Sequence, residues 1–212
     1  MISQSCLYCQ CVQKKCLCDS CFERIPRDTY QVRSRPHLKS VLSLVSFHHP
    51  VVKTLMHAVK FRQNDEAAKV LSRLFWRTLS ELPQSLSVLF SMPLPYFWLP
   101  IPSHVSREKE RGATVLDWLT QTSIDRLNIP YYPSLERLKR TRRFFGLSKC
   151  DRKAEITGAF FIQPDLSLAY LRDRQVYLVD DILTTGATLE EAAKAIASHV
   201  SWPVRAITLC YA

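Results

Sequence analysis

The segment 176–188 constrains the fold more than any other part of the chain. It reads Val-Tyr-Leu-Val-Asp-Asp-Ile-Leu-Thr-Thr-Gly-Ala-Thr. The four apolar residues 176–179 predict a short buried strand. Two carboxylates, Asp180 and Asp181, stand where that strand is expected to end, and a turn of small residues, 184–188, follows. The segment therefore predicts a strand that carries acids at its carboxyl end and leads into a tight turn.

The turn leads into a helix predicted for residues 189–200, and together they form a cradle for phosphate. Thr188 and Glu191 have the spacing of a capping box, with Thr188 as N-cap. The first N–H groups of a helix have no partner within it, and the helix dipole adds partial positive charge there. Gly186 permits a positive φ and a close approach of a ligand. The candidate phosphate ligands are Thr184, Thr185, Gly186, Ala187 and Thr188.

The paired acids suit a sugar, because one carboxylate can accept hydrogen bonds from two vicinal hydroxyls. A phosphate and a diol a few ångströms apart describe a ribose 5-phosphate. The alternative is an ordinary strand-to-helix turn with two surface acids. The segment resembles the phosphoribosyl-pyrophosphate (PRPP) motif of the type I phosphoribosyltransferases. That resemblance implies that Asp180 and Asp181 are catalytic residues that hold the ribose, that the turn holds the 5-phosphate, and that Mg²⁺ accompanies PRPP.

Six of the eight cysteines fall between residues 6 and 21, as two Cys-x-x-Cys pairs and two further thiols. Two such pairs predict a tetrahedral zinc site, which is structural because all four positions are filled. The four candidate ligands are Cys6, Cys9, Cys18 and Cys21. Cys11 and Cys16 could replace Cys9 or Cys18 or be free thiols, and the same cysteines could instead form disulfides or hold an iron–sulfur cluster. So short a module cannot bury a core, and we expect the metal to supply its folding energy.

The order of the remaining elements predicts one α/β domain with a central, mostly parallel sheet, preceded by the zinc module. The expected strands are 41–47, 96–101, 156–162, 176–179 and 204–210, with a short extended piece at 129–132. The expected helices are 50–62, 64–79, 111–127 and 189–200. The expected organisation is a zinc module at 1–25, a connection at 26–49 and a main domain at 50–212. A ligand should lie at the carboxyl ends of the strands.

The chain has a net charge of +10, which favours polyanions or a phosphorylated substrate. The most basic stretch, 138–152, also contains Phe144 and Phe145. Cations beside aromatic rings suit single-stranded nucleic acid, a mobile flap over pyrophosphate, or a solvated loop anchored by buried rings. The candidates for binding pyrophosphate or nucleic acid are Lys60, Arg111, Lys139, Arg140, Arg142, Arg143 and Arg152.

Localisation follows from what the sequence lacks. The amino terminus has neither a basic n-region nor an apolar core, and the most apolar region, 82–102, contains five prolines. We therefore expect a cytoplasmic protein with reduced thiols and no transmembrane segment.

Nearly the whole chain is similar to the ComF/ComFC competence proteins, including the GntX-like members. The elements that carry the resemblance are the double Cys-x-x-Cys module, Val59-Lys60-Phe61, Leu99-Pro100-Ile101-Pro102, Arg111-Gly112, the basic loop ending at Arg152, Gly158-Ala159-Phe160 and the acidic pair with its loop. The resemblance implies a phosphoribosyltransferase-like domain and a role in natural transformation, with single-stranded DNA and the helicase and translocation machinery of DNA uptake as partners. It places the protein in the cytoplasm or peripheral to the inner membrane. An active phosphoribosyltransferase of nucleotide or base metabolism or salvage is the alternative.

The sequence departs from the family pattern at three places. Ala113-Thr114-Val115 replaces Phe-Asn-Gln, Phe144 replaces a glutamine, and Glu155 replaces an asparagine. These changes remove amides near the pyrophosphate and acceptor side while they leave the phosphate loop intact. The sequence therefore favours ligand binding more strongly than transfer.

Overall fold

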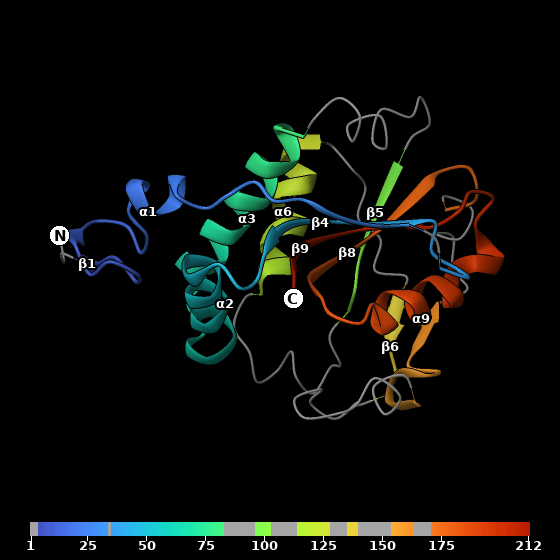
Figure 1. The fold of residues 1–212 in the computed structure, drawn as a ribbon. Coiled ribbons are helices and arrows are strands. Elements are labelled where there is room, and N and C mark those ends of the chain that lie inside the picture. The colour runs from blue at the N-terminus through green and yellow to red at the C-terminus, as the bar shows by residue number, and fades with distance from the viewer. Residues whose placement is uncertain are drawn as a thin grey trace.

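A five-stranded sheet organises the protein, in the order β3-β4-β9-β8-β5 (Figure 1). The computed structural model describes residues 4–33, 35–82, 96–102, 114–127, 135–139, 154–162 and 171–212. The strands are β3 (Tyr30–Arg33), β4 (Ser40–Ser46), β5 (Tyr96–Pro100), β8 (Gln175–Leu183) and β9 (Arg205–Tyr211). Every pairing is parallel except that of the edge strand β3 with β4. The predicted α/β class with a mostly parallel sheet is confirmed.

The helices begin at the signals that the sequence provides. They are α1 (Asp19–Glu23), α2 (Pro50–Arg62), α3 (Asp65–Ser80), α6 (Val115–Leu127), α9 (Ala187–Ile196) and the 3₁₀ turn η1 (Ala197–His199). Pro50 occupies the first turn of α2, where its missing N–H costs nothing. The Asn64 side chain accepts the N–H of Ala67 at 2.9 Å and caps α3. The predictions for α2 and α3 are therefore confirmed.

Helix α6 begins later than expected, at Val115 rather than at residue 111. The hydroxyl of Thr114 accepts the N–H of Asp117 at 3.2 Å, and the Asp117 carboxylate accepts the N–H of Thr114 at 2.6 Å. This reciprocal pair fixes the start of the helix. Residues 111–113 lie outside the described part of the chain.

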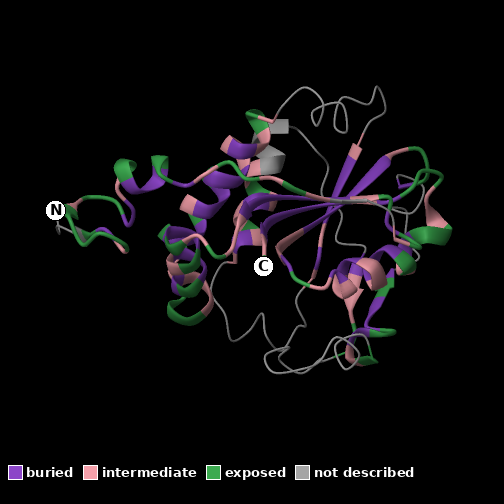
Figure 2. Ribbon diagram, in the orientation of Figure 1, coloured by how far each residue is buried: buried purple, intermediate pink, exposed green. Residues whose placement is uncertain are grey.

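Each face of the sheet is covered by a different layer (Figures 1 and 2). Leu42, Val179 and Ile207 belong to the core shared with α2, α3 and α6. Val41, Leu178 and Ala206, their neighbours along the same strands, belong to the core under α9. Because side chains alternate between the two faces of a strand, these continuous apolar runs are buried on both sides, as parallel sheets require.

Two small antiparallel pairs complete the described structure. One joins β1 (Gln4–Ser5) to β2 (Val12–Gln13), and the other joins β6 (Leu135–Arg137) to β7 (Phe160–Ile162). The strand expected at 156–162 is therefore wrong in length: residues 154–156 form a helical turn, and Gly158 has φ +68°. Its remaining part pairs with β6 and is not part of the large sheet. The piece expected at 129–132 lies outside the described residues.

The stretch 26–49, expected to be a connection, contains two strands of the large sheet. Strand β4 was expected, but the four-residue edge strand β3 was not. The cysteine-rich segment before it packs on α3, where the ring of Phe22 lies 4.0 Å from Arg73 and 5.0 Å from Arg77. Arg77 also forms an ion pair with Glu23 at 2.8 Å. These contacts fix the cysteine-rich segment to the main domain.

Candidate functional site: the turn after β8 and a cluster of thiols

The strand that carries the acids is longer than its apolar run. β8 extends to Leu183, so Asp180 and Asp181 lie within the strand and not after it. Its pairing with β5 ends at Val179, and beyond that point it is paired with β9. The sequence missed this extension because polar residues interrupted the apolar pattern, while pairing to β9 keeps the backbone extended.

Consecutive residues of a strand point to opposite faces, and the two acids do so here. The Asp181 carboxylate faces α2, where its Oδ2 lies 3.0 Å from Nζ of Lys60. The charges of Lys60 and of Arg137, which lies on β6, both act on Asp180. Lys60, in the last turn of α2, is therefore a basic candidate that the fold brings next to Asp181.

The ionisation of this group of residues is strongly perturbed. Burial, followed by the charge of Asp181, raises the pKa of Asp180 to about 8. The Asp180 carboxylate also accepts the N–H of Asp181 at 2.8 Å. Burial would lower the pKa of Lys60, but the charge and the hydrogen bond of Asp181, together with the charge of Asp180, outweigh it and raise that pKa. At neutral pH Asp180 is thus mostly protonated, and it lies next to the contact between Lys60 and Asp181.

The turn after β8 ends in a left-handed residue. Gly186 has φ +73° and is the N-cap of α9, and no side chain caps the helix. The predicted capping box is therefore wrong, because the helix begins at Ala187 and Thr188 lies inside it. Glu191 instead accepts the N–H of Gly158 at 2.8 Å and joins α9 to the turn before β7.

All five predicted phosphate ligands, residues 184–188, lie in this turn and the first helical turn. The hydroxyl of Thr185 lies 3.4 Å from the N–H of Ala187, a long contact that an anion can replace. The remaining N–H groups of the first turn have no partner within the helix. The arrangement can therefore bind an anion at the carboxyl end of β8.

Arg35, from the segment between β3 and β4, braces the same turn. Its Nη2 donates to the carbonyl of Thr185 at 2.7 Å. A Cβ on Gly186 would lie 2.8 Å from its Cζ, so a side chain there would displace the guanidinium, and the positive φ itself favours glycine. Nε of Arg35 is buried without a hydrogen-bond partner among the described residues. The sequence analysis missed Arg35, since it lies 150 positions from its partner.

Four thiols converge near the amino terminus. The Sγ atoms of Cys6, Cys9, Cys11 and Cys18 all lie within 4.8 Å of one another. The Cys6 N–H donates to the carbonyl of Cys11 at 2.9 Å and closes the first knuckle. Cys18 caps α1, and its sulfur accepts the N–H of Cys21 at 3.4 Å. Four convergent sulfur ligands fit a structural zinc ion.

The thiols of the cluster are not equivalent. Burial opposes ionisation of Cys6, but the N–H groups of Cys18, Cys9 and Tyr8 outweigh it and lower its pKa to about 6. Cys21, a predicted ligand, lies beside the mutually close set, and burial together with the thiols of Cys18, Cys9 and Cys6 raises its pKa to about 12. The pKa of Cys11 is likewise raised to about 12, first by the thiol of Cys9, and the set of four mutually close sulfur atoms contains Cys11 where the spacing assigned Cys21.

The basic candidates are only partly described. Lys139 is exposed at the end of the segment that contains β6. Arg111, Arg140, Arg142, Arg143 and Arg152 lie outside the described residues, and so do Ala113 and Phe144. Of the other departures from the family pattern, Val115 is buried at the start of α6, and Glu155 is partly buried in the turn before β7.

The known proteins that are similar to this chain are named as competence or DNA-utilization proteins. "Competence protein F" of Haemophilus influenzae is 31% identical over 145 residues, which span 66% of this chain and 59% of that protein. "DNA utilization protein YhgH" of Salmonella typhi is 26% identical over 167 residues, 78% of this chain and 70% of that protein. The protein of the same name in Escherichia coli K12 is 26% identical over 170 residues, 80% of this chain and 71% of that protein.

No protein-family model matches the chain. None of the helices in the described part of the chain combines the length and the apolar character needed to cross a bilayer.

Proposed function

Because the chain belongs to the ComF/ComFC family of competence proteins, we propose that it acts in DNA uptake during natural transformation and binds PRPP or ribose 5-phosphate. The similarity to competence and DNA-utilization proteins supports the first part. The second rests on one observation, which is the glycine-ended turn before α9 beside Asp180, Asp181 and Lys60. In this proposal, residues 50–212, together with β3 and β4, form a type I phosphoribosyltransferase-like domain behind a zinc module.

The turn supplies the phosphate subsite. The first N–H groups of α9 and the hydroxyls of Thr184, Thr185 and Thr188 bind the 5-phosphate, as expected where an unpaired helix start meets an anion. Arg35 holds the turn from its carbonyl side through Thr185. It thereby keeps the N–H groups turned toward the ligand and adds positive charge nearby.

The acids supply the ribose subsite. A largely protonated Asp180 can donate one hydrogen bond to the ribose and accept another, while Asp181 accepts a hydrogen bond from a ribose hydroxyl or stays paired with Lys60. Mg²⁺ prefers oxygen ligands and, when bound with PRPP, neutralises the pyrophosphate. If transfer occurs, an acceptor bonds to C1 of the ribose as pyrophosphate leaves with the electron pair of the broken C1–O bond, and the Asp181 carboxylate stabilises the positive charge that develops on the ring. Lys60 then lies where it can meet the leaving group.

Single-stranded DNA is the proposed macromolecular partner. A net charge of +10 supports it, and Lys139 is the described member of the basic stretch that the sequence analysis assigned to nucleic acid. The cytoplasm, with peripheral association with a helicase and translocation machinery, is the proposed location. An active phosphoribosyltransferase of base or nucleotide salvage remains the second candidate, because Asp181 and Lys60 meet at the carboxyl end of the sheet.

Calorimetry tests the ligand. We expect ribose 5-phosphate to bind the wild-type protein, PRPP with Mg²⁺ to bind more tightly, and Thr185→Val to weaken both. Thr54→Val is the matched control, because the hydroxyl of Thr54 donates to the carbonyl of Pro50 in its own helix, at 2.9 Å, and not to a residue of the turn. The proposed pocket is refuted if neither ligand binds the wild-type protein.

Pyrophosphate release separates the two candidates. Release with a base or nucleotide acceptor, abolished in Asp181→Asn, would establish the transferase. Binding without release across bases, nucleotides and oligonucleotides would favour a ligand-sensing competence factor.

A further inference from the structure

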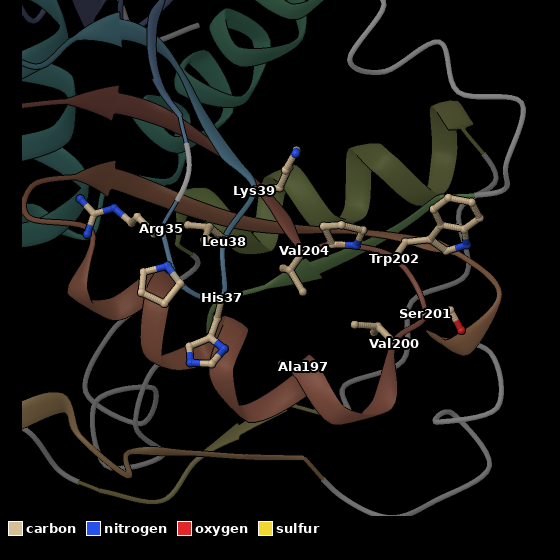
Figure 3. Close-up of a pocket in the computed structure, with 11 residues that line it drawn as sticks. Arg35, His37, Leu38, Lys39, Ala197, Val200, Ser201, Trp202 and Val204 are labelled. Atoms are coloured by element: carbon tan, nitrogen blue, oxygen red, sulfur yellow. The ribbon is translucent and has the colours of Figure 1, made fainter.

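A groove of about 400 Å³ lies between the segment that joins β3 to β4 and the segment that joins α9 to β9 (Figure 3). Arg35 lies at one end of it and Trp202 at the other, with Val200 and Val204 between them. The groove begins beside the phosphate turn, since the guanidinium of Arg35 also contacts Gly186 and Thr185. It is nevertheless distinct from the turn, because its other lining residues come from 36–39 and 197–204.

The lining is basic. Arg35, His37 and Lys39 contribute to it, and none of the 11 lining residues is acidic. Glu190, on the neighbouring α9, accepts the backbone N–H of His37 at 3.0 Å and is not part of the lining. Such a surface attracts a polyanion.

The groove also offers flat and apolar surfaces. The side chain of Trp202 is 39% exposed, while the other tryptophans of the described residues, at positions 76, 98 and 118, are buried or partly buried. Leu38 and Val204, 1% and 2% exposed, form an apolar base under it. The exposed part of the indole can stack on the face of any nucleobase.

We propose that this groove is a binding track for single-stranded DNA. A base stacks on Trp202, and Lys39 contacts the backbone phosphates of a strand that runs toward the phosphate turn. Cations that follow a backbone, together with an aromatic platform, are the combination that binds single strands without reading their sequence. The inference rests on the DNA-binding part of the proposed function and assigns it a site outside the basic stretch 138–152.

Fluorescence and anisotropy titrations test the track with an oligothymidylate of about a dozen nucleotides. We expect the oligonucleotide to quench wild-type tryptophan emission and Trp202→Phe to lose most of that quenching. Trp202→Ala should bind about fivefold to a hundredfold more weakly, the range found for the loss of one stacked base. Lys39→Ala should reduce the slope of log K against log salt by about 0.7, one phosphate contact to a single strand. Lys39 is the cation to replace, because Arg35 also braces the turn.

Matched controls isolate each effect. Tyr30→Ala removes another exposed aromatic ring, 49% exposed, outside the groove, and Lys53→Ala removes an exposed cation on α2. Both should bind like the wild type. A strand of abasic deoxyribose phosphates should bind wild type and Trp202→Ala equally, because it has no base to stack.

The outcomes distinguish this inference from the function on which it rests. If the wild type binds DNA and the Trp202 and Lys39 variants bind it equally well, the track is refuted while DNA binding stands. If the wild type binds no oligonucleotide at physiological salt, both are refuted. If a mononucleotide binds as tightly as the oligonucleotide, the groove is a nucleotide site and not a track.

Discussion

The contact between Gly186 and Arg35 makes a quantitative prediction. In Gly186→Ala the alanine must adopt φ +73°, which costs about 1 kcal/mol for a residue other than glycine. The Cβ would also lie 2.8 Å from the guanidinium of Arg35, which must move and give up its hydrogen bond to Thr185. Loss of that charge-assisted bond adds about 1 to 2 kcal/mol. We expect a total destabilisation of about 2 to 3 kcal/mol.

Gly158 is the matched control. It has a similar φ, +68°, but nothing lies within 4 Å of the position of an added Cβ. Gly158→Ala should therefore cost only the backbone strain, about 1 kcal/mol. Urea denaturation of the zinc-loaded protein, followed by circular dichroism, measures both free energies of unfolding.

A double-mutant cycle assigns the difference. In an Arg35→Ala background the clash is absent, so Gly186→Ala should then cost about 1 kcal/mol, as Gly158→Ala does. The reasoning is refuted if Gly186→Ala costs the same with and without Arg35, or no more than Gly158→Ala.

Three further predictions concern ionisable and metal-binding groups. Asp180 keeps its proton in the folded protein up to about pH 8 but loses it near pH 4 when unfolded, so its contribution to stability should fall as the pH rises between those values, by at most about 1.4 kcal/mol per pH unit. Urea curves of Asp180→Asn should lack this fall, and pH profiles that run parallel in the wild type and the variant would contradict Asp180 as its cause. Lys60→Met should lower the free energy of unfolding by about 1 kcal/mol and, in calorimetry, should weaken the binding of PRPP more than that of ribose 5-phosphate. Equal weakening of both ligands would exclude Lys60 from the pyrophosphate subsite. Chelation should unfold the cysteine-rich segment, and Cys11→Ser should lower zinc affinity more than Cys16→Ser in a competition assay; the reverse order would exclude Cys11 as a ligand.

Local patterns in the sequence determined much of the fold. Pro50 and Asn64 start α2 and α3 where expected, because a cap or a fixed φ acts within one helical turn. The apolar run 176–179 marked strand β8, since a strand buried on both faces needs no alternation. The two Cys-x-x-Cys pairs located the thiol cluster, because their short spacing is a local feature of the sequence.

The tertiary structure decided what depends on distant partners. Pairing with β9 carries β8 through Asp180 and Asp181 and turns the two acids to opposite faces. The bend of the first knuckle places Cys11 among the close thiols, and Arg35 reaches a turn 150 residues away. Spacing in the sequence encodes neighbours along one element, whereas these contacts form only when separate elements pack together.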